Sequence, residues 1–173
     1  MKFPRTIRLD PSDVNVFPLA AEPGEWAVPG TFAFADLPSP KRSPGFAQAG
    51  AEPAALSRKE QLAFKSGWLG TATFGRSTMV QVVDITAGQY DEVVRAIADH
   101  LVSAYGAPDR DAALAAARDE AAYAAGLCDH PVNTLLAIER AFTDDGISER
   151  VRAITPEPAG AHTRVWEIVE DED

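Results

Sequence analysis

The chain has 173 residues, of which 46% are hydrophobic and 24% charged, a composition typical of one globular domain with a sizeable core. The formal net charge is −10, and an acidic surface repels phosphate backbones, so nucleic acid is not an expected partner. No uncharged apolar run approaches the roughly 18 residues of a membrane helix, and no signal peptide is expected. The single cysteine, Cys128, excludes an internal disulfide and fits a cytoplasmic protein.

The N-terminal third is predicted to form short antiparallel strands. Clusters of turn residues such as Asp10–Asp13 separate segments that alternate between polar and apolar residues or are rich in aromatic residues. The segments are residues 6–9, 14–17, 26–28 and 31–35, which we expect to pair as a ribbon.

Residues 38–55 form a Pro/Gly-rich segment that includes Pro38, Pro40, Pro44 and Pro53. Loops of this length without secondary structure are either functional or poorly ordered. We interpret the segment as a mobile surface loop, with a lid or partner-binding role as the alternative.

Ser57 and Glu60 have the spacing of a capping box, which predicts a helix from there to about Trp68. The following stretch, residues 70–77 (GTATFGRS), has the glycine spacing of a phosphate-binding loop with Arg76 in place of lysine. That mechanism needs a helix after the glycines, whereas the sequence predicts a strand there. We therefore interpret the stretch as a turn between helix and strand.

The strongest signals lie in the middle of the chain. Residues 78–86 are rich in β-branched residues and almost continuously apolar, which predicts a central strand covered on both faces. Apolar residues at helical spacing predict a helix over 89–106, and an alanine-rich stretch predicts a second helix over 109–128.

Residues 134–154 are ambiguous, since their apolar residues also fit a helix. We favour a β-hairpin with its turn at Thr143–Gly146, because an Asp-Gly pair favours tight turns. A last strand is expected over residues 163–169, followed by a frayed acidic tail at 170–173. The prediction is one α+β domain over residues 1–173, with a mainly antiparallel sheet and the helices 89–106 and 109–128 packed as an αα-hairpin on one face.

The candidates for chemistry are weak. Cys128, Asp129 and His130 place a thiol, a carboxylate and an imidazole together, but adjacent residues seldom reach catalytic geometry, and a helix C-terminus disfavours a thiolate. Packing of the two helices would bring Asp99 and His100 towards acidic residues of the second helix. No His-x-x-x-His or Glu-x-x-His spacing occurs, so neither a metal nor another cofactor is expected.

Four stretches carry a resemblance: residues 3–13 (FPRTIRLDPSD), 21–28 (AEPGEWAV), 64–70 (FKSGWLG) and 127–132 (LCDHPV). Together they resemble a family of small bacterial proteins classed as a domain of unknown function. The resemblance covers most of the chain outside the loop at 38–55. It implies a bacterial cytoplasmic protein and supplies no activity, cofactor or functional residues.

Two functional hypotheses follow. The first is a non-catalytic binding or accessory protein with a protein partner, for example one that assists a larger enzyme assembly, which the missing catalytic signature and the acidic C-terminal portion favour. The alternative is a small-molecule enzyme or ligand-binding protein with a pocket near Asp129 and His130.

Overall fold

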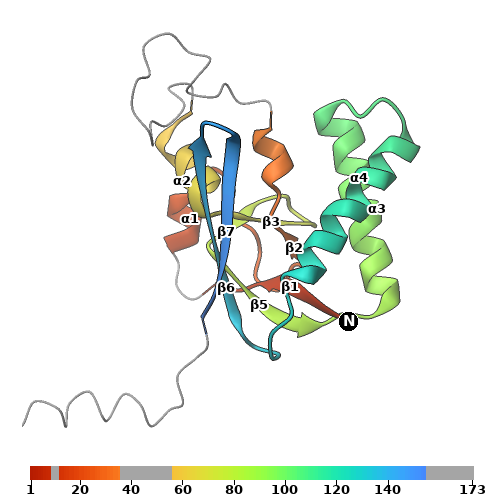
Figure 1. The fold of residues 1–173 in the computed structure, drawn as a ribbon, viewed down its shortest axis with the longest axis horizontal. Coiled ribbons are helices and arrows are strands. Elements are labelled where there is room, and N and C mark those ends of the chain that lie inside the picture. The colour runs from red at the N-terminus through yellow and green to blue at the C-terminus, as the bar shows by residue number, and fades with distance from the viewer. Residues whose placement is uncertain (9–11, 36–55, 155–173) are drawn as a thin grey trace, which may run out of the picture.

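The structure, a computed structural model, describes residues 1–8, 12–35 and 56–154 (Figure 1). It has the predicted α+β class, with helices and antiparallel sheets in one chain. Its elements in chain order are β1 (Lys2–Thr6), α1 (Ser12–Val16), β2 (Ala27–Val28), the 3-10 helix η1 (Thr31–Phe34), α2 (Arg58–Ser66), β3 (Trp68–Gly70), β4 (Arg76–Ser77), β5 (Met79–Asp84), α3 (Ala87–Tyr105), α4 (Arg110–Gly126), β6 (Leu135–Thr143) and β7 (Gly146–Ile154).

The larger sheet has the strand order β1-β5-β6-β7, and every neighbouring pair is antiparallel. β5 lies between β1 and β6, so the strand predicted to be central is an interior strand. Its Val80 and Val82 point to one face and are fully buried, with Val80 paired to Leu136 of β6. This face contributes one half of a hydrophobic core.

The smaller sheet, β2-β3-β4, lies between the larger sheet and the long helices (Figure 1). Ala27 and Trp68 pack with Val80 and Val82 of the larger sheet. The next residues along the two strands, Val28 and Leu69, pack with α3 and α4 instead. The alternation of side chains along a strand thus lets a sheet of very short strands connect two layers.

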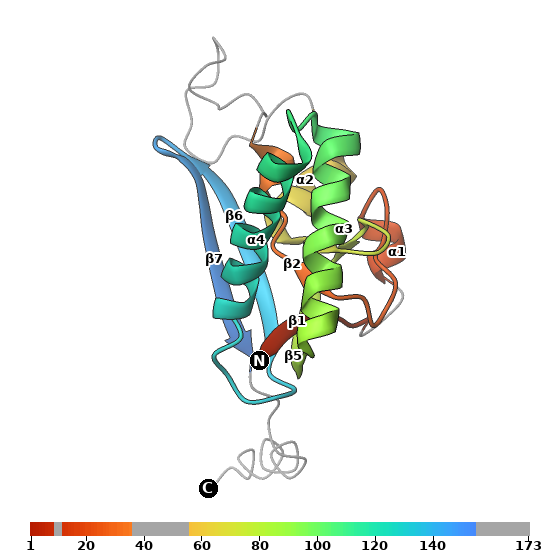
Figure 2. The ribbon, with the colours of Figure 1, turned by 90° about the vertical axis from the view of Figure 1, so that its right-hand side faces the viewer.

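α3 and α4 form the predicted αα-hairpin and stand side by side on one side of the molecule (Figure 2). Thr86 and Gln89 form a capping box at the start of α3, and Gly106 ends the helix with φ of +65°. Asp109 caps α4. Small side chains allow close packing, and the buried faces consist of Val93, Val94, Ile97 and Ala98 on α3 and Ala113, Ala117, Ala121 and Ala124 on α4.

The ambiguous segment is a β-hairpin, as favoured above. β6 and β7 pair from Leu135↔Ile154 to Thr143↔Gly146, and Gly146 has the positive φ that the turn requires. Ile138 and Arg140 face the core, whereas Glu139 faces solvent. The hairpin therefore carries a buried arginine, Arg140, on its inner face.

The predictions for the N-terminal third were partly wrong. Residues 14–17 lie largely in helix α1, and residues 31–35 contain the 3-10 helix η1, neither of which is a strand. Little of the expected ribbon forms in the described residues: one antiparallel bridge joins Arg5 and Trp26, but β1 pairs along its length with β5, and β2 pairs with β3. Gly30 has a left-handed backbone that begins a helical turn, and Phe34 then packs on Phe64. Long-range pairing and aromatic packing override the local alternation here.

Three predicted segments lie outside the described residues: the loop at 38–55, the strand at 163–169 and the acidic tail at 170–173.

Candidate functional site

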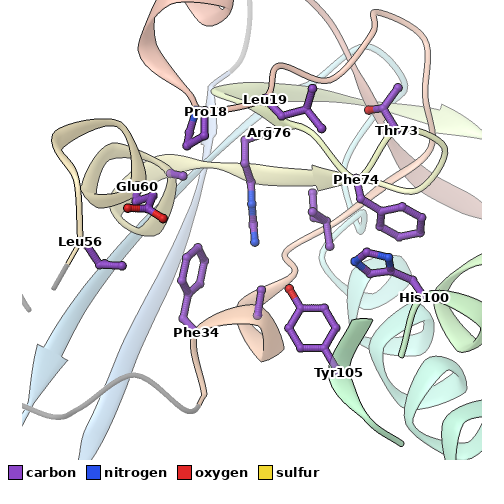
Figure 3. Close-up of a pocket in the computed structure, with 13 residues that line it drawn as sticks. Pro18, Leu19, Phe34, Leu56, Glu60, Thr73, Phe74, Arg76, His100 and Tyr105 are labelled. Carbon is purple, nitrogen blue, oxygen red and sulfur yellow. The ribbon is translucent and has the colours of Figure 1, made fainter. Parts of the chain in front are cut away.

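A cavity of about 490 Å³ opens between η1, α2, the β3–β4 hairpin and the C-terminal end of α3 (Figure 3). Its volume is within the range of small-molecule sites, and more of its lining is apolar than polar. The residues that line it are Pro18, Leu19, Ala33, Phe34, Leu56, Glu60, Ala63, Leu69, Thr73, Phe74, Arg76, His100 and Tyr105.

Arg76 of β4 extends into this cavity and is only 7% exposed. Its Nη1 donates to the carbonyl oxygens of Pro29 (3.2 Å) and Gly67 (3.1 Å), and its Nη2 donates to that of Gly30 (3.2 Å). The guanidinium carbon lies 4.6 Å from the ring centroid of Phe34, a cation–π contact. The backbone carbonyls and the ring therefore hold the side chain in one orientation.

Burial, and next the charge of Arg140, lower the pKa of Arg76 to about 9. The group still carries a positive charge at neutral pH. Within the described residues no carboxylate lies within ion-pair distance of it. The Glu120 carboxylate lies on the other side of the Pro29–Gly30 peptide unit from Arg76. Its Oε1 accepts from the N–H of Gly30 at 2.8 Å, whereas Arg76 donates to the carbonyl oxygen of Pro29.

Two glycines make room for Arg76. A Cβ on Gly67 would lie 3.0 Å from Cδ of Arg76 and 2.7 Å from the Ala63 carbonyl oxygen. A Cβ on Gly30 would lie 2.4 Å from Cβ of Leu69, and Gly30 has φ of +67°. The backbone around the arginine is therefore adapted to a close approach.

A second buried arginine supports the first. Arg140 of β6 donates from Nη1 to the carbonyl oxygens of Phe64 (2.9 Å) and Gly67 (3.0 Å) and from Nη2 to that of Pro29. Its Nε contacts Oε1 of Glu149 at 3.0 Å. Unlike Arg76, Arg140 therefore has a carboxylate partner on the neighbouring strand.

Aromatic rings form the walls of the cavity. The rings of Phe74 and His100 are stacked at 3.7 Å between centroids with an interplanar angle of 6°. Burial, followed by the charge of Arg76, lowers the pKa of His100 below its ordinary value. Figure 3 shows the Arg76 guanidinium, the His100 ring and the Tyr105 hydroxyl directed towards the same space. The cavity thus offers polar donors among flat apolar surfaces.

Glu25, a buried carboxylate, fixes the turn that carries Phe74. Its Oε1 accepts from the backbone N–H groups of Ala72 (2.9 Å) and Thr73 (2.7 Å), and its Oε2 accepts from the Thr73 hydroxyl (2.8 Å). Phe74 follows with φ of +56°, unusual for a residue with a side chain. This conformation places its ring against His100.

The structure places the sequence candidates elsewhere. Cys128 is 1% exposed and packs in the core between the two sheets, where burial raises the pKa of its thiol to about 12. Asp129 is exposed, and His130, which is half-buried, accepts a hydrogen bond from Lys2 through its carbonyl oxygen. None of these three residues is among those that line the cavity.

The other predicted grouping, Asp99 and His100 beside acidic residues of the second helix, does not form either. Asp99 pairs with Arg110 on the surface, whereas its neighbour His100 turns into the cavity. His100 is half-buried because the ring of Phe74, in the β3–β4 turn, stacks on it. No cluster of three or more His, Cys, Asp or Glu side chains suited to a metal exists within residues 1–8, 12–35 and 56–154.

The sequence did single out the segment that carries Arg76, but as a phosphate-loop look-alike. The structure shows strands β3 and β4 on either side of its turn, so no helix N-terminus faces the glycines. The local sequence, Gly75-Arg76-Ser77, gives no signal that this arginine is buried.

Fold and site together define an α+β protein with an arginine at the base of an aromatic-walled pocket. None of its described helices combines the length and hydrophobicity needed to cross a bilayer. Over residues 1–168 the sequence matches the family described as "Family of unknown function (DUF6505)". The chain belongs to this family, which confirms the resemblance to a domain of unknown function. Comparison with curated proteins found no match, and neither did comparison with solved structures.

Proposed function

We propose that this protein binds a small anionic molecule with an apolar body in the cavity over Arg76. The observation that carries the proposal is the environment of the guanidinium: it is buried, charged and hydrogen-bonded to neutral carbonyl groups alone in the described part of the chain. A buried charge is costly unless an opposite charge accompanies it. A ligand carrying one negative charge would supply that partner.

The rest of the cavity supports the same occupant. The apolar walls, including Phe34 and Phe74, match an apolar ligand body. A small number of polar groups lie together in the same cavity. Such a combination of apolar lining and a few oriented polar groups is typical of small-molecule sites. The proposal keeps the binding role that the sequence favours and moves the pocket from Asp129 and His130 to Arg76.

An accessory role in the bacterial cytoplasm fits this binding function. The single buried Cys128 suits a reducing compartment, and a protein that holds a small anion can pass it to an enzyme. A protein partner would then contact the face where the cavity opens.

The test is a titration of the ¹⁵N-labelled protein, followed by NMR, with three anions: octanoate, 2-naphthoate and 2-naphthylphosphonate. The neutral 2-naphthamide serves as the uncharged comparison. Saturable shifts at Thr73, Phe74 and His100 with the anions, and weaker shifts with the amide, are the expected result. If none of the three anions gives saturable shifts, the proposed function is wrong.

A pair of surface variants locates the site without disturbing the core. Leu19 lines the cavity and is 55% exposed, whereas Val14 on α1 is 53% exposed and does not line it. Leu19→Glu places a negative charge beside the site and should weaken anion binding by at least about tenfold. Val14→Glu adds the same charge and should leave the affinity within about twofold of the wild type. Equal effects of the two variants would contradict this location.

A further inference from the structure

The free edge of Arg76 limits the chemistry of the ligand head group. Three of the N–H groups of Arg76 donate to backbone carbonyls, and these three come from Nη1 and Nη2. The Nε–H and one N–H on Nη2 have no acceptor among the residues that the structure describes. Nε and Nη2 share one edge of the guanidinium, and two N–H groups on one edge match the two oxygens of a carboxylate.

The charge around the cavity favours a single negative charge on the ligand. Among the described residues that line the cavity, Arg76 is the one arginine or lysine. The pKa of His100 is lowered from its ordinary value of 6.5, so the ring is neutral at any pH above 6.5. Glu60, at the rim of the cavity, is itself negative. A doubly charged phosphate or phosphonate would bring one charge into the cavity without a partner, at the cost of its hydration.

The walls favour a flat ligand body. Four rings, those of Phe34, Phe74, His100 and Tyr105, line the cavity beside the aliphatic side chains of Leu19, Leu56 and Leu69. The ring of Tyr105 meets that of Phe32 edge-on at 5.5 Å and that of His100 at 5.4 Å, so its position is fixed from two sides. Aromatic rings gain from offset stacking and edge-to-face contact beyond the area they bury.

We infer, on the basis of the binding function proposed above, that the ligand is an aromatic monocarboxylate. Its carboxylate accepts hydrogen bonds from the Nε/Nη2 edge of Arg76, and its ring packs between Phe34 and the Phe74–His100 pair. Tyr105 closes the ring site at the C-terminal end of α3.

The test compares four probes of nearly equal size by isothermal titration at pH 7.5. 2-Naphthoate is the expected ligand, decahydro-2-naphthoate removes the flat ring, 2-naphthylphosphonate changes the head group, and 2-naphthamide removes the charge. We expect 2-naphthoate to bind about three- to tenfold more tightly than its saturated analogue, the contribution typical of ring contacts. It should bind at least about tenfold more tightly than the phosphonate or the amide.

Tyr105→Leu gives a second readout at a residue that is 44% exposed and outside the core clusters. It should reduce the ratio between the affinities for 2-naphthoate and its saturated analogue towards one. Val102→Leu, on the exposed side of the same helix, should leave that ratio unchanged.

The outcomes distinguish a failure of the aromatic monocarboxylate inference from a failure of the proposed anion-binding function. Equal or tighter binding of the phosphonate overturns the carboxylate class, and equal binding of the saturated analogue overturns the flat body, while both leave an anion site in place. Binding of 2-naphthamide equal to that of 2-naphthoate, or no binding of any probe, overturns the anion site itself.

Discussion

Arg76 and Arg140 donate hydrogen bonds to the same two carbonyl oxygens, those of Pro29 and Gly67, although they belong to different sheets. Arg140 reaches these carbonyls from the larger sheet, and its charge is balanced by Glu149. Arg76 reaches them from the smaller sheet and keeps one edge for the cavity. Two like charges are thus held close together by shared acceptors, which makes Arg140 a support for the site.

The first prediction concerns that support. Arg140→Met should lower the free energy of unfolding by about 3–5 kcal/mol, because it leaves the Glu149 carboxylate without its cationic partner and the Phe64 carbonyl without its side-chain donor. Arg152 on the outer face of the same hairpin pairs with Glu139 at 3.4 Å, and both side chains are more than half exposed. Arg152→Met should therefore cost only about 0–1 kcal/mol.

Urea denaturation followed by circular dichroism measures both free energies. Losses of equal size in the two variants would show that the buried arginine does not hold the hairpin to the smaller sheet.

The second prediction contrasts two glycines. Gly30→Ala should destabilise the protein by roughly 2–4 kcal/mol, because the new Cβ would overlap Leu69 and the backbone is left-handed there. Gly88 lies in the first turn of α3, and a Cβ there would meet no atom within 4 Å. Gly88→Ala should stabilise the protein by about 0.5–1 kcal/mol through helix propensity.

Thermal unfolding of the two variants beside the wild type provides the measurement. A melting temperature of Gly30→Ala equal to or above that of the wild type would mean that the approach of Gly30 to Leu69 relaxes at little cost.

Local signals were sufficient for much of the fold. β5, α3 and α4 were predictable because each combines a strong propensity with a regular apolar pattern, and the capping box at Ser57 and Glu60 is present as expected. The turn of the β6–β7 hairpin was predictable from its Asp-Gly pair. In each case the determining residues lie within a few positions of one another.

The site was not predictable, because its contacts are long-range. Arg76 bonds to carbonyls of residues 29, 30 and 67, and nothing in the sequence near position 76 specifies them. His100 lies in the cavity because Phe74 stacks on it, and Phe74 depends on the buried Glu25. The pairing of β1 with β5, some 80 residues apart, was missed for the same reason.

The third prediction concerns Cys128. Its thiol is buried in the core, and burial raises the pKa to about 12, so the reactive thiolate is scarce at ordinary pH. We expect Ellman's reagent at pH 8 to modify the native protein at least about a hundredfold more slowly than the protein unfolded in urea. Fast labelling of the native protein would restore Cys128 as a candidate nucleophile.

The last prediction concerns His100 and pH. Burial, then the charge of Arg76, lowers the pKa of His100 in the folded protein below its ordinary value of 6.5. Between the two pKa values the unfolded chain binds the proton more readily than the folded protein, so this contribution to stability rises with pH. It is complete above pH 6.5 and is lost as the pH falls through the window below it.

Replacing His100 by glutamine removes this linkage while keeping a polar side chain of similar length. The wild type should therefore lose more stability than His100→Gln between pH 7.5 and 5.5, measured by urea denaturation at each pH. Comparing how the free energy of unfolding changes with pH in the two proteins cancels the contribution of Glu120, whose pKa is raised in both. An NMR titration of the His100 ring protons gives the folded pKa directly, and a value at or above 6.5 would contradict the prediction.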